Sequence, residues 1–356
     1  MDQSNKLRIG VAYHGNRILR HVDEDMREIV NHGMNVVVHM FSHNDWDRHL
    51  GVMKDIVSIS ESYGLEVWID NWGLGGPPGD KSHFLQYHPE AHQVYSDGSI
   101  DPVSACYNSE AFVKFTKDWL DTVKGFGGKR IMWDEPRFKE KKREWELKEG
   151  EALPAFTCFC PTCKKLFEER YNKPMPTTEI TPELAEFRSW MLMNYFDTVT
   201  THAALLGMEN YMGIMPRTLE YTGGLMKLEH VDDFGIDPYW HPENPIRYKE
   251  PYSHVYNATK EVISRGKEFG KRTHLWIQGY NIPDGYEDEM VIATDAAYDA
   301  GARTILYWSY RGAESNTYRS ERADRCWYAM GEAAMRIRQR HFDAIREERL
   351  KALQKG

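Results

Sequence analysis

The sequence has no long apolar run, no basic stretch and no even number of cysteines. Each of these absences argues against one class of partner or fold. No apolar run reaches the roughly 18 residues that a membrane-spanning helix needs, so we expect no membrane partner. The formal charge is −9 and no basic stripe offsets it, which argues against a nucleic-acid partner. Met1–Lys6 shows no charged segment followed by an apolar one, so we expect no secretory signal and a cytoplasmic location.

The five cysteines argue against a disulfide framework, since the number is odd and no extracellular signal is visible. Cys158, Cys160 and Cys163 lie close together in the chain, and Cys106 is the natural fourth member from another segment. Four thiolates suit the tetrahedral coordination of zinc and leave no open position for water. This pattern predicts a structural zinc site, with unliganded reduced thiols as the alternative. Cys326 is expected in the core, and we expect no organic cofactor.

Eight apolar, strand-like runs alternate with helical patterns along the chain. Glycines stand just before several of these runs, as is typical of helix C-termini that lead into a strand. This alternation predicts an α/β fold, a (β/α)8 TIM barrel that forms one catalytic domain over residues 1–356. A doubly wound open sheet is the alternative. The predicted strands are Leu7–Tyr13, Asn35–Phe41, Leu65–Asn71, Arg130–Asp134, Glu209–Ile214, Asp233–Tyr239, Thr273–Tyr280 and Thr304–Tyr310.

Two connections are longer than plain loops. We expect long insertions after the third and fourth strands, at about residues 72–110 and 136–206. Long segments at the C-terminal ends of barrel strands commonly build the active-site face. A last helix at about residues 326–353 is expected to close the barrel.

Four of the predicted strands each end in a polar residue at the equivalent position. Asp70, Asp134, Asp237 and Gln278 each follow an apolar run, at the ends where a barrel carries its catalytic groups. Asp134 is followed directly by Glu135, and two adjacent acids raise each other's pKa values. Glycoside hydrolysis needs one protonated and one ionised carboxyl, so this pattern predicts carboxylate chemistry. The alternative is a pair of solvated acids that opens a loop.

Aromatic and basic residues stand near the same strand ends. Eleven tryptophans and twenty tyrosines are more than packing normally requires, and their rings can stack on sugars. Core packing is the competing interpretation for each ring. Histidines near the first two strand ends are expected to bind sugar hydroxyls, and an arginine after the eighth strand is expected to meet an anionic substrate group. The predicted substrate-binding residues are His14, His39, Asp70, Trp72, Tyr239, Trp240, Gln278, Tyr280, Trp308 and Arg311.

Several motifs resemble TIM-barrel glycoside hydrolases. Cys158-Phe159-Cys160-Pro161-Thr162-Cys163 after a strand that ends in Asp134-Glu135 is similar to the zinc-bearing microbial β-galactosidases. Tyr87-His88-Pro89-Glu90 and Asp237-Pro238-Tyr239-Trp240 are similar to related glycosidase families. The resemblance implies that Glu135 is the general acid/base and that Cys106 completes the zinc site. Asp134 replaces the asparagine of those β-galactosidases, and Gln278 replaces their nucleophilic glutamate.

We therefore predict a glycoside hydrolase that acts on a small carbohydrate. Glu135 protonates the leaving oxygen, and Asp237 or Asp134 acts at the anomeric carbon. The alternatives are a metal-dependent barrel hydrolase or isomerase that uses His14, His39 and Asp70, and a carbohydrate-binding barrel without catalysis. A homo-oligomer is compatible with the sequence, which specifies neither an oligomeric state nor the sugar, the anomer or the stereochemical course.

Overall fold

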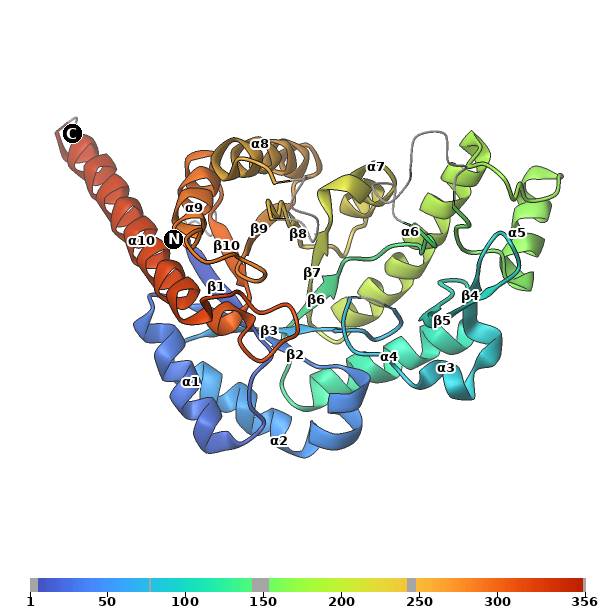
Figure 1. Ribbon diagram of the computed structural model, residues 1–356, viewed down its shortest axis with the longest axis horizontal. Coiled ribbons are helices and arrows are strands. Elements are labelled where there is room, and N and C mark those ends of the chain that lie inside the picture. Colours follow the sequence, from blue (N-terminus) through green and yellow to red (C-terminus); the bar gives the residue numbers. More distant parts are fainter. Residues whose placement is uncertain (1–5, 77, 143–153, 242–247, 355–356) are drawn as a thin grey trace. The chain divides into compact units, whose positions relative to one another are not determined.

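Eight strands form a closed parallel barrel in the order β1-β10-β9-β8-β7-β6-β3-β2 (Figure 1). The computed structural model describes residues 6–76, 78–142, 154–241 and 248–354. The predicted (β/α)8 barrel is confirmed. Its strands are β1 (Arg8–Tyr13), β2 (Val36–Met40), β3 (Glu66–Asp70), β6 (Arg130–Asp134), β7 (Glu209–Ile214), β8 (Asp233–Ile236), β9 (Arg272–Gln278) and β10 (Thr304–Trp308).

Helices follow most of the strands, as the alternation predicted. They are α1 (Leu19–Asn31), α2 (His43–Ser62), α3 (Phe84–Tyr87), α4 (Glu110–Gly125), α5 (Pro161–Tyr171), α6 (Pro182–Leu205), α7 (Leu219–Thr222), α8 (Pro251–Phe269), α9 (Glu289–Asp299) and α10 (Ala323–Leu353). An antiparallel pair, β4 (His92–Val94) and β5 (Ile100–Ala105), stands apart from the barrel strands. Among the described helices, none is long and apolar enough to span a membrane.

Helix α8 shows how local sequence sets the ends of an element. The Glu250 carboxylate accepts hydrogen bonds from the backbone N–H groups of Tyr252 and Ser253, at 2.9 and 2.8 Å, and so caps the first turn. Pro251 fits the first helical position, where no N–H is needed. Gly270 ends the helix in the left-handed conformation (φ 65°), which a glycine adopts without steric cost.

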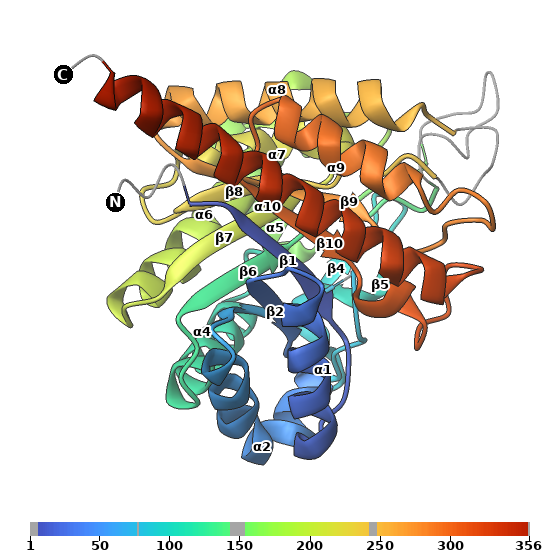
Figure 2. The ribbon, with the colours of Figure 1, turned by 90° about the vertical axis from the view of Figure 1, so that its left-hand side faces the viewer.

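The backbone groups into two compact units. The first comprises residues 1–40, 51–69 and 233–356, and the second comprises residues 41–50 and 70–232. In the first unit, α8 packs against α9 and α9 against α10, and these three helices lie side by side in Figure 2. In the second unit, α4 packs against α6.

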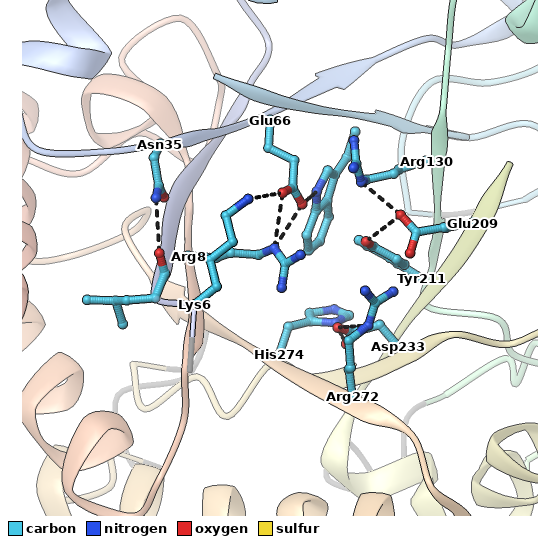
Figure 3. A network of polar contacts seen from close by, with 12 residues as sticks. Lys6, Arg8, Asn35, Glu66, Arg130, Glu209, Tyr211, Asp233, Arg272 and His274 are labelled. Carbon is cyan, nitrogen blue, oxygen red and sulfur yellow. Dashed lines mark hydrogen bonds and ion pairs between the residues drawn. The ribbon is translucent and has the colours of Figure 1, made fainter. Parts of the chain in front are cut away.

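Charged residues open several strands and are paired within each unit. In the first unit, Glu66 accepts hydrogen bonds from Lys6 Nζ and Arg8 Nε, both at 2.9 Å (Figure 3). Asp233 lies 2.7 Å from His274 Nδ1, and both side chains are buried. These pairs lie at strand N-termini, the end of a barrel where polar residues usually contribute to stability.

The second unit has a similar pair at its strand starts. Arg130 Nε lies 3.0 Å from Glu209 Oε2, and the Tyr211 hydroxyl donates to the same oxygen at 3.2 Å (Figure 3). Arg130 opens β6 and Glu209 opens β7. The two strands pair in parallel from these residues onward, so the ion pair fixes their register at the first position.

The predicted long segments contain regular structure. The range 72–110 holds α3, β4 and β5, and the range 136–206 holds α5 and α6. Residues 143–153 of the second range lie outside the described residues, as do residues 1–5 of the expected signal-free N-terminus. That these segments are insertions, and that residues 1–356 form one domain, stay predictions. The predicted last helix, about 326–353, is α10, which begins at Ala323.

Candidate active site

Two aspartates end β3 and β6 in the second unit and are held close by backbone contacts. Asp70 is the last residue of β3, and Asp134 is the last residue of β6. The Asn71 N–H donates to the Met132 carbonyl at 3.2 Å, and the Asp134 N–H donates to Asn71 Oδ1 at 3.1 Å. Asn71 therefore joins the two strand ends and fixes the backbone that carries both carboxyl groups.

The surroundings of these aspartates favour their neutral forms. Burial raises the pKa of Asp134 to about 7, although the charge of Arg137 opposes this shift. The pKa of Asp70 is raised well above its usual value, first by burial and then by the Asp134 charge, while the Trp72 backbone N–H acts in the opposite direction. Both carboxyl groups therefore hold their proton to a higher pH than an exposed aspartate does.

Glu135 follows Asp134 in an unusual backbone conformation. Its φ of 39° lies in the left-handed region that non-glycine residues rarely adopt. Its N–H donates to the Gly213 carbonyl at 2.9 Å, which holds this turn against the end of β7. The carboxylate forms an ion pair with Arg137, whose backbone N–H donates to the Tyr107 hydroxyl at 3.2 Å. After this turn the Glu135 side chain lies beside the Arg137 guanidinium.

These groups line one pocket of the second unit. Asn71, Asp134, Glu135, Arg137 and Tyr107 all contribute to its wall, together with the glycine-rich segment 73–76. The pocket thus combines carboxyl groups, a cation and a phenol. Such a set can exchange a proton with a bound ligand and hold its hydroxyl groups. Asn71, Tyr107 and Arg137 were not predicted, although Asn71 and Arg137 lie within two residues of predicted acids.

Gln278 lies in the first unit, where its side-chain amide is hydrogen-bonded to backbone groups. Its Oε1 accepts hydrogen bonds from the N–H groups of Trp240 and His241, at 3.0 and 2.9 Å. Its Nε2 donates to the carbonyls of His241 and Tyr280, at 2.8 and 3.1 Å. The amide is completely buried, and these four bonds use both of its donors and both lone pairs of its acceptor. The geometry favours a role in positioning the segment after β8 over direct contact with a sugar.

Glu289 was not predicted as a site residue, yet three side chains donate to it. These are Trp240 Nε1 at 2.8 Å, His241 Nε2 at 2.6 Å and the Tyr248 hydroxyl. Trp240 is completely buried, so its ring is not available as a stacking surface in this conformation. No local pattern reveals this cluster, because Glu289 lies more than 40 residues along the chain from each of the three donors.

The other predicted aromatic residues of the first unit form edge-to-face pairs. His14 packs against Trp308 with ring centroids 4.9 Å apart, and Tyr239 packs against Tyr280 at 5.3 Å. Trp308 and Tyr239 are only partly buried, so their rings stay available to a ligand. Trp72 belongs to the second unit and is also partly buried. Sugar binding by these residues stays a prediction.

Three further predicted residues of the first unit, His39, Arg311 and Asp237, are buried or form ion pairs. His39 is completely buried with Nε2 2.8 Å from Ser60 Oγ, and burial lowers its pKa to about 3. Arg311 lies 3.1 Å from Glu28 and 2.7 Å from Glu314. These contacts favour structural roles for His39 and Arg311. Asp237 is buried directly after β8, and its pairing with Glu135 stays a prediction.

Four cysteines of the second unit form one buried cluster. The sulfurs of Cys106, Cys158, Cys160 and Cys163 all lie within 4.8 Å of one another. The Sγ of Cys106 is 3.4 Å from that of Cys163 and 3.6 Å from that of Cys160. A zinc–sulfur bond of about 2.3 Å gives tetrahedral sulfur–sulfur edges of about 3.8 Å. The residues therefore fit a four-thiolate zinc site.

Comparison with known proteins identifies similar structures but no family. No protein-family model and no curated protein matches the chain. The catalytic domain of β-amylase from Paenibacillus polymyxa is similar with a TM-score of 0.64 and 10% identity, over 93% of this chain and 99% of that one. The PgaB (BpsB) glycoside hydrolase domain from Bordetella bronchiseptica gives a TM-score of 0.59 and 12% identity, over 91% and 99%.

A third similar structure is the endo-1,4-β-D-mannanase from Thermotoga petrophila. It gives a TM-score of 0.57 and 12% identity, over 92% of this chain and 99% of that one. At these identities the similarity establishes the barrel fold. The function must be argued from the residues of this chain, since one fold carries many activities.

Proposed function

We propose that this protein is a glycoside hydrolase that acts on a carbohydrate with its carboxyl groups at the C-terminal ends of β3 and β6. The observation that carries the proposal is the pocket in which Asp134, whose pKa is raised to about 7, lies beside the carboxyl group of Glu135. The buried Asp70 ends the neighbouring strand β3. Glycosidases use carboxyl groups whose environments separate their pKa values. The similarity of the barrel to those of glycoside hydrolases agrees with this proposal.

In this mechanism Glu135 gives its proton to the glycosidic oxygen as the bond to the anomeric carbon breaks. A second carboxylate either attacks that carbon or removes a proton from an attacking water. Asp134 and Asp237 are the candidates for the second role. Asn71 and Tyr107 are placed to hold substrate hydroxyl groups, since both line the same pocket.

The ion pair with Arg137 affects how the roles are assigned. The Arg137 guanidinium lies against the Glu135 carboxyl group, so in the proposed mechanism the substrate would separate the two before Glu135 donates its proton. In the reverse assignment Asp134, which keeps its proton up to about pH 7, is the acid and Glu135 acts at the anomeric carbon. We favour Glu135 as the acid because the resemblance to the β-galactosidases assigns it that role.

A series of aryl glycosides with different leaving groups tests the assignment. A variant without its general acid loses most activity on poor leaving groups and retains more on good ones, which need no protonation. We expect this pattern for Glu135→Gln, with a loss of about 10²-fold or more on poor leaving groups. The exposed Glu110→Gln on α4 is the matched control. The same pattern in Asp134→Asn instead would reverse the two roles.

We also propose that the four cysteines bind a structural zinc ion. Two backbone N–H groups point at the sulfurs, from Asn108 to Cys106 and from Cys163 to Cys160, both at 3.4 Å. N–H donors of this kind stabilise thiolates. The ion would join the segment before α4 to the start of α5, and it would have no open position for chemistry.

A further inference from the structure

A second cluster of possible metal ligands lies in the second unit, separate from the cysteines. His43 and Asp47 lie one turn apart on α2, and His83 directly precedes α3. The ligand atoms of these three residues lie within 4.8 Å of one another. His83 Nε2 is 3.1 Å from Asp47 Oδ2, and His43 Nε2 is 4.0 Å from Asp47 Oδ1. Both imidazoles therefore present the same nitrogen to one carboxylate.

The two rings are held in this arrangement by their neighbours. They stack with centroids 3.7 Å apart and planes 18° apart. His43 Nδ1 is 2.8 Å from Ser82 Oγ, which also accepts the Phe84 N–H at 3.2 Å. When Nδ1 carries the hydrogen of that contact, Nε2 keeps its lone pair and can bind a metal. A hydrogen bond at the second nitrogen is the usual way in which proteins orient a histidine ligand.

The surroundings suit a cation better than two protonated histidines. Phe115 packs on the His43 ring at 4.8 Å and excludes water from that side. Asp47 and His83 are half-exposed and partly exposed, so an ion can enter from solvent. Two protonated rings in a stack would place like charges close together, whereas one ion shared by both rings places a single positive centre beside the carboxylate.

We propose that His43, Asp47 and His83 bind a divalent transition-metal ion through two imidazole nitrogens and one carboxylate oxygen. Imidazole and carboxylate ligands suit zinc, copper, nickel and cobalt ions. Three protein ligands leave at least one position for water. The ion would fasten the start of α2 to the segment before α3. That segment continues from residues 73–76, which line the candidate active-site pocket, so occupancy is expected to stabilise one of its walls.

The site does not depend on the proposed glycosidase activity or on the cysteine cluster. Equilibrium dialysis of the full chain against Co²⁺ tests the site separately from both. The amount of Co²⁺ bound is compared between wild type and His83→Ala. We expect wild type to bind one Co²⁺ per chain more than the variant. Any sulfur-to-cobalt absorption from the cysteines is expected to be equal in the two proteins. Ser82→Ala, which keeps all three ligands, is expected to weaken binding about 10- to 100-fold.

His88→Ala is the matched control, since His88 stacks on Phe84 and pairs with Glu90 away from the proposed ligands. It is expected to bind Co²⁺ as wild type does. Circular dichroism checks that each variant is folded, and Asp47→Asn at an exposed helix position serves as the second ligand variant. Equal stoichiometry and affinity in wild type, His83→Ala and Asp47→Asn would overturn the proposal.

Discussion

Replacing Asp134 with asparagine is expected to change how stability depends on pH. In the folded protein Asp134 keeps its proton up to about pH 7, whereas an unfolded aspartate loses it near the ordinary value of 3.8. Between these pH values the folded state binds more protons than the unfolded state. Stability therefore falls as the pH rises through this window, and the full cost is present above about pH 7. Asparagine cannot ionise, so the variant avoids that cost.

The size of the effect follows from the shift. About three pKa units correspond to about 4 kcal/mol at about 1.4 kcal/mol per unit. Asp134 keeps some exposed surface in the pocket, where solvent screens part of this cost, so about 2 kcal/mol is the expected contribution. For a chain of 356 residues this corresponds to a melting-temperature difference of about 3 °C.

Thermal unfolding followed by circular dichroism at pH 5 and pH 8 provides the assay. The Tm of Asp134→Asn minus that of wild type is expected to be about 2 °C more positive at pH 8 than at pH 5, because roughly a third of the cost is already present at pH 5. Asp118→Asn, a change on the outer surface of α4, is the control and is expected to give the same difference at both pH values. A difference for Asp134→Asn that is independent of pH, or larger at pH 5, would refute the raised pKa of Asp134.

Three other changes test separate parts of the structure. Cys158→Ser is expected to remove one zinc ion per chain and lower the Tm; elemental analysis that finds the same zinc content in both proteins contradicts the zinc proposal. His274→Leu leaves Asp233 buried without its nearest partner and is expected to cost about 3 kcal/mol, or about 4 °C in Tm; an unchanged Tm would show that the pair adds nothing. Gln278→Leu leaves buried backbone groups without partners and is expected to cost about 3 kcal/mol in urea unfolding; wild-type stability would argue against its positioning role.

The barrel could be predicted because each strand carries its own local signal. Apolar runs mark the strands, and the structure places their ends within a few residues of the predicted ones. The largest difference is at β8, which ends at Ile236 where the prediction continued to Tyr239. Pro238 has no N–H to give to a neighbouring strand, which explains the earlier end.

The start of one helix and one strand pair differ from the prediction, although the sequence carries signals for both. The helical pattern of the sequence predicts a helix over Leu50–Ser62, whereas α2 begins at His43. Ser42 and Asp45 cap this earlier start, because each side chain accepts the other's backbone N–H, at 3.1 and 3.2 Å. The antiparallel β4–β5 pair turns at Asp97-Gly98, a typical hairpin turn sequence. Both signals span only a few residues, so hydrophobic periodicity does not reveal them.

The site was only partly predictable. Asp70 and Asp134 follow from the strand-end pattern, because parallel strands end on the same face of a barrel. The contacts of Gln278 and Glu289 could not be predicted, since they join residues 37 to 49 positions apart and depend on how the segment after β8 folds back. The ion pair of Glu135 with Arg137 depends on the positive φ of Glu135, which no local pattern indicates.

Hydrolysis of aryl glycosides by wild type and Glu135→Gln tests the proposed function most directly. The panel should contain both anomers of several sugars, and the rate should be measured with Glu110→Gln as the control. Wild type and Glu110→Gln are expected to cleave at least one glycoside, and Glu135→Gln is expected to do so at least about 10²-fold more slowly. Equal rates for wild type and Glu135→Gln, or no cleavage of any glycoside by folded wild type, would contradict the proposed function.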